Sequence, residues 1–143
     1  MTAQDNGGDK GEPRKLRVLV ADDSSDAADS LALLVKTWGH DARAVYDGRA
    51  VLETAQAYLP DVALLDLGLP GVDGYQLALQ FRRASALQDV VLFAVTGYDW
   101  KNAQIRSKEY GFEEHLLKPV DPERLRSLLD ALKQRLATQG GGQ

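Results

Sequence analysis

The sequence predicts an α/β protein in which a parallel sheet is covered by helices on both faces. Short runs of branched apolar residues alternate along the chain with segments whose apolar residues recur at helical spacing. The most apolar run, VALLD at Val62–Asp66, is followed by a loop rich in glycine, as expected of a strand buried on both faces. The 143 residues, 44% of them hydrophobic, are enough for one domain with a substantial core.

The first half of the chain contains two strand-like runs, each followed by a helical pattern. Ser24 or Ser25 can cap the first helix, and Gly39 ends it. Pro60 ends the second helix because proline cannot continue one. The predicted elements are a strand at Leu16–Ala21, a helix at Asp26–Trp38, a strand at Ala42–Tyr46 and a helix at Arg49–Tyr58.

The second half repeats this alternation three times. The last predicted helix has a clear apolar stripe of leucines. We expect flexible tails at residues 1–15 and 138–143, which leaves one domain at residues 16–137. The elements after the strand that ends at Asp66 are a helix at about Gly74–Ala84, a strand at Asp89–Thr96, a helix at Asp99–Tyr110, a strand at Phe112–Leu117 and a helix at Asp121–Ala137.

Five strands that alternate with five helices favour a flavodoxin-like, doubly wound (βα)5 fold with strand order 2-1-3-4-5. Ligands of such folds bind at the carboxyl ends of the strands, where the strand order reverses between strands 1 and 3. Residues that carry chemistry are therefore expected at those strand ends.

Composition excludes several classes of function. The net charge is −4 and no basic stretch stands out, which argues against a nucleic-acid partner. The chain has no cysteine, so disulfides and thiolate metal sites are impossible. No signal peptide or membrane-spanning run is present, and we expect a cytoplasmic protein with no membrane partner.

Three carboxylates are predicted to meet at the switch point. Asp22 and Asp23 follow the first strand, and Asp66 ends the third. Carboxylates without histidine or cysteine suit a hard cation, and Mg²⁺ is the natural candidate. We expect Asp23 and Asp66 to bind Mg²⁺ directly, Asp22 to bind it directly or through water, and the backbone carbonyl of Gly68 to supply another ligand.

Asp66 is the candidate phosphoacceptor, because a carboxylate can attack phosphorus to give an aspartyl phosphate. The hydroxyl of Thr96 and the ammonium of Lys118 follow the next two strands and can each hold a phosphoryl oxygen. Catalysis of such a transfer consists mainly of positioning and charge neutralisation.

These motifs, taken together, resemble the receiver domain of two-component response regulators over about Leu16–Ala137. The matching stretches are Asp22-Asp23, LLDLGLPGVDGY around Asp66, VTG around Thr96 and HLLKPVD around Lys118. The resemblance implies that a histidine kinase or a histidine phosphotransfer protein donates a phosphoryl group to Asp66. It also implies that Asp22 and Asp23 are the acidic pair, Gly68 a carbonyl ligand, Thr96 the switch hydroxyl and Lys118 the phosphate contact, with a cis Lys118–Pro119 bond.

One position departs from the family pattern. Three residues before Lys118 the family usually has tyrosine or phenylalanine, but this chain has His115. Because histidine is smaller and titrates near neutrality, the coupling between Thr96 and His115 would be weaker or sensitive to pH. Our hypothesis is that the His115 ring changes rotamer on phosphorylation; the alternative is a partly exposed strand residue without a special role.

The sequence thus predicts a stand-alone, phosphorylation-controlled binding module rather than an enzyme, with only self-catalysed phosphotransfer and slow autodephosphorylation. The resemblance implies an output face on helix 4 (Asp99–Tyr110), strand 5 (Phe112–Leu117) and helix 5 (Asp121–Ala137), for a downstream protein that the sequence does not identify. Tyr98 and Trp100 are either core residues or part of a docking surface. The alternatives are a Mg²⁺-dependent aspartyl-phosphate phosphatase, which would need a second acid where Gly68 stands, a flavin carrier on the same fold, and a receiver cut from a longer hybrid kinase.

Overall fold

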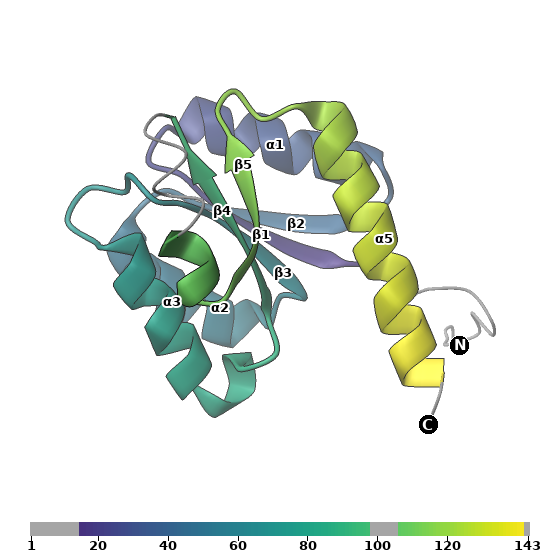
Figure 1. The fold of residues 1–143 in the computed structure, drawn as a ribbon. Helices are drawn as coiled ribbons and strands as arrows, with labels where there is room; N and C mark the ends of the chain where they lie inside the picture. Colours follow the sequence, from purple (N-terminus) through teal and green to yellow (C-terminus); the bar gives the residue numbers. More distant parts are fainter. Residues whose placement is uncertain (1–14, 98–105, 142–143) are drawn as a thin grey trace.

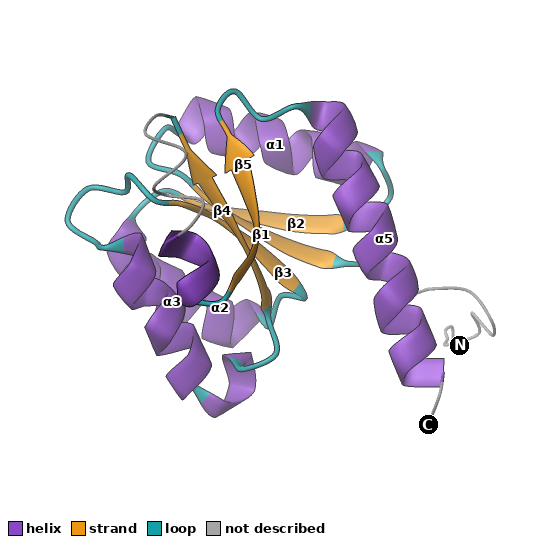
Figure 2. Ribbon diagram, viewed as in Figure 1, coloured by secondary structure: helices purple, strands orange, loops and turns teal. Residues whose placement is uncertain are grey.

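The structure, a computed structural model, describes residues 15–97 and 106–141. Its five strands form one parallel sheet in the order β2-β1-β3-β4-β5, which confirms the predicted topology. Figure 1 shows α1 and α5 on one side of the sheet and α2 and α3 on the other, and Figure 2 shows the strands fanning out between them. The strands are β1 (Arg17–Ala21), β2 (Asp41–Val45), β3 (Val62–Asp66), β4 (Val91–Thr96) and β5 (Phe112–Leu117).

The helices lie close to their predicted positions. Ser24 caps the first of them, since its hydroxyl oxygen accepts a hydrogen bond from the backbone N–H of Ala27. The four α-helices that can be given bounds are α1 (Ser25–Thr37), α2 (Val51–Tyr58), α3 (Gly74–Arg83) and α5 (Pro122–Gly141), and short 3-10 turns lie at Gly48–Ala50 and Ser85–Leu87.

Two helices differ from the sequence prediction by more than one residue at one end, and a third lies mostly outside the described residues. The helix expected at Arg49–Tyr58 begins with a 3-10 turn, and α2 itself starts at Val51. The last helix continues past Ala137 to Gly141, because glycine weakens a helix without forbidding it. Of the helix predicted at Asp99–Tyr110, residues 106–109 are helical, and the rest lies outside the described residues, as do Tyr98 and Trp100.

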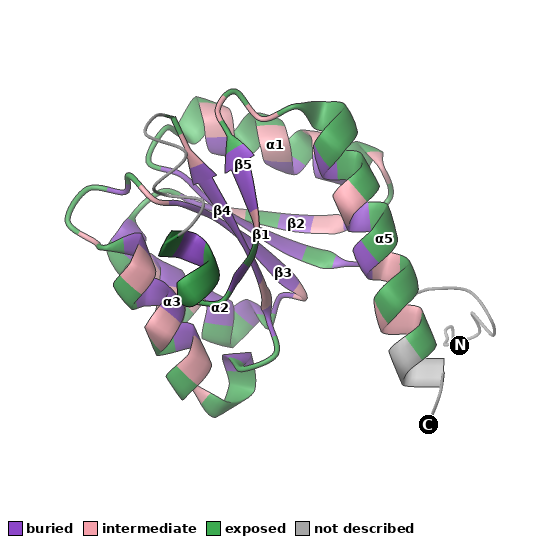
Figure 3. Ribbon diagram, in the orientation of Figure 1, coloured by how far each residue is buried: buried purple, intermediate pink, exposed green. Residues whose placement is uncertain are grey.

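The core has two parts, one on each face of the sheet. On the first face, Leu19 and Leu65 pack against Phe81 of α3. On the second face, Val20 and Leu64 pack against α1 and α5. Every residue of β3 is buried, as Figure 3 shows for the centre of the sheet, which agrees with the expectation of a strand covered on both faces.

The strand register brings the carboxyl ends of the strands to one edge. Ala21 of β1 pairs with Leu65 of β3, and Asp66 pairs with Val95 of β4. Thr96, the last residue of β4, pairs with Leu117 of β5. The residues that end β1, β3, β4 and β5 therefore share one rim. Among the helices described, none is both long enough and apolar enough to cross a lipid bilayer.

Candidate functional site

Three carboxylates meet at the rim. One oxygen from each of Asp22, Asp23 and Asp66 can be chosen so that all three lie within 4.8 Å of one another. Asp22 and Asp66 are 4% and 5% exposed, whereas Asp23 is exposed to solvent. Two buried carboxylates this close repel each other strongly unless a positive charge compensates them.

Asp22 is held by backbone groups on both sides. Its own N–H donates to the carbonyl of Val45 at the end of β2, at 3.1 Å. Its Oδ1 accepts a hydrogen bond of 2.9 Å from the N–H of Ser24, the residue that caps α1. The turn that starts α1 thus fixes the orientation of this carboxylate.

Asp66 uses both of its carboxylate oxygens. Oδ1 accepts a hydrogen bond of 2.8 Å from the backbone N–H of Gly68, and Oδ2 accepts one of 2.8 Å from Nζ of Lys118. The sequence predicts a role for the carbonyl of Gly68, whereas in the structure it is the N–H of Gly68 that contacts Asp66. That N–H points at the same carboxylate from the loop that follows β3.

Lys118 supplies the positive charge. Its Nζ lies 2.8 Å from Oδ2 of Asp66 and 3.2 Å from Oδ2 of Asp22. Burial by itself would lower the pKa of Lys118, but the hydrogen bonds and charges of Asp66 and Asp22 outweigh it, and the net pKa lies above its usual value. The ammonium is therefore charged at neutral pH.

Backbone contacts fix where Lys118 stands. Its N–H donates to the carbonyl of Thr96 at 2.7 Å, which ties the residue after β5 to the end of β4. The Lys118–Pro119 bond is cis, as the resemblance implied. Thr96 itself is half-buried at the rim, and its hydroxyl as a phosphate contact stays a prediction.

The excess negative charge of the cluster favours the binding of a divalent cation. Three carboxylates against one ammonium give the cluster a formal charge of −2. All donors are hard carboxylate oxygens, and Asp23 is open to solvent, which suits an ion that keeps several of its waters. The residues present thus fit Mg²⁺.

The loop that carries Gly68 is packed against its neighbours at two glycines. A Cβ on Gly48 would lie 2.8 Å from Cγ2 of Val72, and a Cβ on Gly74 would lie 2.8 Å from Cδ2 of Leu67. Only glycine permits such close approaches without movement of the loop. These contacts hold the segment that follows Asp66 against the turn after β2 and against the start of α3.

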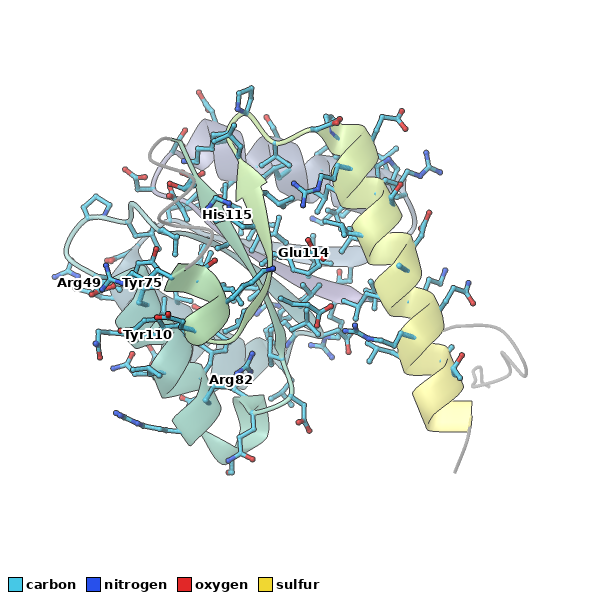
Figure 4. The ribbon with its side chains drawn as sticks, in the orientation of Figure 1. Arg49, Tyr75, Arg82, Tyr110, Glu114 and His115 are labelled. Carbon is cyan, nitrogen blue, oxygen red and sulfur yellow. The ribbon has the colours of Figure 1, made fainter. Side chains whose placement is uncertain are left out.

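An aromatic cluster joins the start of α3 to the segment before β5. The rings of Tyr75 and Tyr110 lie 5.1 Å apart, and the guanidinium carbon of Arg106 lies 4.2 Å from the centre of the Tyr75 ring. Figure 4 shows both tyrosines on the same side of the sheet. This cluster anchors residues 106–110 on α3.

His115 is buried within β5. Its exposure is 9%, so its interpretation as a partly exposed residue is wrong. Burial and, secondarily, the charge of Arg124 lower the pKa of His115 from its usual value of 6.5. The neutral imidazole is therefore the favoured form in this position.

The comparisons with known proteins agree on one family. A family model described as "Response regulator receiver domain" matches residues 18–130. Protein PilH of Pseudomonas aeruginosa is 28% identical over 116 residues, which cover 81% of this chain and 96% of PilH. The DNA-binding response regulator MtrA of Mycobacterium tuberculosis is 32% identical over 109 residues, which cover 76% of this chain but 46% of MtrA. The chain thus spans about half the length of this DNA-binding relative.

Solved structures show the same architecture. A putative response regulator from Chloroflexus aurantiacus superposes with a TM-score of 0.77 and 26% identity, covering 85% of this chain and 99% of that one. The REC domain of AraT, a response regulator from Geobacillus stearothermophilus, gives a TM-score of 0.75 and 28% identity, covering 89% and 99%. With its carboxylates and lysine gathered at the rim of such a sheet, and with the family model matched over most of its length, this chain belongs to the response regulator receiver domain family.

Proposed function

We propose that Asp66 is the residue that accepts a phosphoryl group in this receiver domain, with Mg²⁺ bound beside it. The observation that carries the proposal is the contact of Lys118 Nζ with Oδ2 of Asp66, within a cluster of three carboxylates. Asp66 is the member of this cluster on the central strand β3, and Lys118 and the N–H of Gly68 already contact its two oxygens.

In the proposed transfer, one carboxylate oxygen of Asp66 attacks the phosphorus of a phosphohistidine. An O–P bond forms, the N–P bond breaks, and the imidazole leaves with the electron pair and takes up a proton. Lys118 moves its hydrogen bond from the carboxylate to a phosphoryl oxygen, and the hydroxyl of Thr96 donates a hydrogen bond to another. Mg²⁺, held by Asp22, Asp23, Asp66 and the Gly68 carbonyl, would neutralise the phosphoryl charge.

The alternative of a Mg²⁺-dependent phosphatase is not favoured. That chemistry needs a second acid two residues after the nucleophile, and Gly68 stands there. The chain is a receiver-type signalling module rather than a conventional enzyme. Hydrolysis of its own aspartyl phosphate is the slow reaction that we propose for it.

Receiver domains interact with histidine kinases or phosphotransfer proteins. We propose that one of these is the donor, and that phosphorylation acts on a protein partner through the end of helix 4, β5 and α5. The described part of that face carries Leu117, which is 45% exposed, and ion pairs of β5 with α5. A cytoplasmic location and the lack of a nucleic-acid partner complete the proposal, together with a tail at residues 1–15 before the domain that begins at residue 16.

The test uses the full chain, phosphoramidate and MgCl₂, with intact mass as the readout. We expect the mass of one added phosphoryl group, which is lost in brief alkali because acyl phosphates hydrolyse readily. Asp66→Asn and an excess of EDTA should each abolish the gain. Steady release of phosphate from a small phosphate ester would instead revive the phosphatase.

Asp89→Asn is the matched control. It makes the same chemical change at an exposed acid just before β4, at the opposite edge of the sheet. This variant should be labelled like the original chain. Labelling that survives Asp66→Asn, or that fails equally in both variants, would contradict the assignment of Asp66.

A further inference from the structure

The Nε2 atom of His115 stands out among the described residues. It is the one buried side-chain nitrogen or oxygen in the described part of the chain that has no hydrogen-bond partner. Buried polar atoms are almost always paired, because an unpaired one loses its hydration and gains nothing in return. The buried position of this ring thus carries a free-energy cost that calls for an explanation.

The strand register, one contact from α5 and a small cavity describe the surroundings of the ring. His115 pairs in register with Ala94 of β4, which offers only a methyl group. The backbone carbonyl of His115 accepts a hydrogen bond of 3.2 Å from Nη1 of Arg124, so this contact from α5 is made to the backbone of the strand. Figure 4 shows His115 and Glu114 on β5. A cavity of about 120 Å³ adjoins the ring and is lined by Ser107, Lys108, Phe112, Glu113, Glu114, His115 and Arg124.

The charged groups around this cavity disfavour a positive imidazolium. Lys108 faces it from the end of helix 4 and Arg124 from α5, whereas Glu113 and Glu114 belong to β5 itself. Both glutamates are engaged elsewhere, Glu114 with Arg124 at 3.2 Å and Glu113 with Arg135 at 2.8 Å. β4 contributes no charge opposite the ring.

Protonation raises the free energy of the imidazole in its buried position in two ways. An imidazolium has two N–H donors, and Nε2 would then be a donor without an acceptor inside the protein. A charge in this place would also lose its hydration beside Arg124. In water both N–H groups are satisfied, so protonation shifts the balance towards the ring outside its pocket.

We propose that His115 is a proton-operated switch, in which protonation drives the imidazole out of its pocket and rearranges the surface formed by Lys108, Glu114 and Arg124. The direction follows from the preference for the neutral form in the buried position: the ring is inside at neutral pH and leaves as the pH falls below its usual pKa of 6.5. Lys118 follows His115 by three residues on the same chain segment, so the switch acts on the strand that leads to the carboxylate cluster.

The test is an NMR titration of the full chain, which has only two histidines. His40→Asn leaves the His115 ring as the single imidazole signal. We expect its midpoint below the usual histidine pKa, and the backbone amides of Ser107, Lys108 and Glu114 should shift with that same midpoint. Arg124→Gln, a change at the surface, should raise the midpoint because it removes the nearby positive charge.

His115→Phe keeps an aromatic ring but cannot titrate, so the amide shifts should vanish in it. His115→Gln serves the same purpose if phenylalanine disturbs the packing. Amide shifts that persist in these variants, or a ring that titrates while the three amides stay still, would overturn the proposal. Asp66→Asn should retain the full transition although it blocks labelling, so this inference stands or falls separately from the role of Asp66.

Discussion

The backbone N–H of Leu16 donates a hydrogen bond of 3.2 Å to Nδ1 of His40, and both residues are buried. This contact ties the start of β1 to the turn between α1 and β2. It requires a neutral imidazole, since a protonated Nδ1 is a donor and cannot accept.

The free energy of unfolding should therefore fall in acid. Burial and the charge of Lys133 lower the pKa of His40 from its usual 6.5, although Asp130 partly opposes them. Below that pH the unfolded chain binds more protons than the folded one, so stability is complete above it and declines as the pH drops. Urea unfolding between about pH 7.5 and 5 measures this slope, to which His115 contributes with the same sign.

Two variants separate the contribution of His40 from that of His115. His40→Asn can still accept from Leu16 but cannot titrate in this range, so its slope should be shallower. His40→Ala leaves the buried N–H of Leu16 unpaired and should cost about 1–3 kcal/mol at neutral pH. If His40→Asn showed the slope of the original chain, the contact would not be the cause.

Magnesium should stabilise the fold through the carboxylate cluster. A ligand that binds only the folded state adds about 2.7 kcal/mol at a hundred times its dissociation constant. We expect the melting temperature to rise with MgCl₂, and the rise should be much smaller in Asp23→Asn, which removes one candidate ligand. Asp89→Asn should keep the full rise, and an equal rise in both variants would place the ion elsewhere.

Removal of the Lys118 ammonium between the two buried acids should make the stability of the fold depend more strongly on bound metal. In Lys118→Gln, Asp22 and Asp66 face each other without the cation that lies 3.2 Å and 2.8 Å from them. The melting temperature in EDTA should fall, and Mg²⁺ should restore more of it than it adds to the original chain. Labelling by phosphoramidate should slow by about tenfold or more, as expected for the loss of one charge-assisted hydrogen bond.

The close packing of Gly48 against Val72 should make the site loop sensitive to a single methyl group. In Gly48→Ala the new Cβ would lie 2.8 Å from Cγ2 of Val72, so the loop after Asp66 must shift at a cost of about 1–3 kcal/mol. Adding Val72→Ala should recover part of that loss in a double-mutant cycle. Gly97→Ala, where a Cβ meets nothing within 4 Å, should change the free energy of unfolding little.

The sequence predicted the fold and the site best where a pattern of residue types is typical of a single structure. The apolar run before Asp66 predicted a central strand, and the ends of the other strands placed Asp22 and Lys118 on the same rim. The N–H groups of Ser24 and Gly68 that orient the carboxylates could not be foreseen, because any non-proline residue has such a group. Likewise, nothing in the local pattern around His115 reveals that its Nε2 lacks a partner, because that depends on residues that are distant in the sequence.

The ion pairs on β5 have a consequence for the behaviour of the protein in concentrated solution. β5 ends the sheet on one side, so its outer backbone groups are the natural place for a foreign strand to add. On this strand, Glu113 and Glu114 form ion pairs with Arg135 and Arg124 of α5. A second copy of the chain that paired with β5 would have to break both ion pairs. It would also bring its own charged side chains close to the two glutamates. The ion pairs therefore disfavour the addition of a strand, and hence aggregation, at the β5 edge of the sheet.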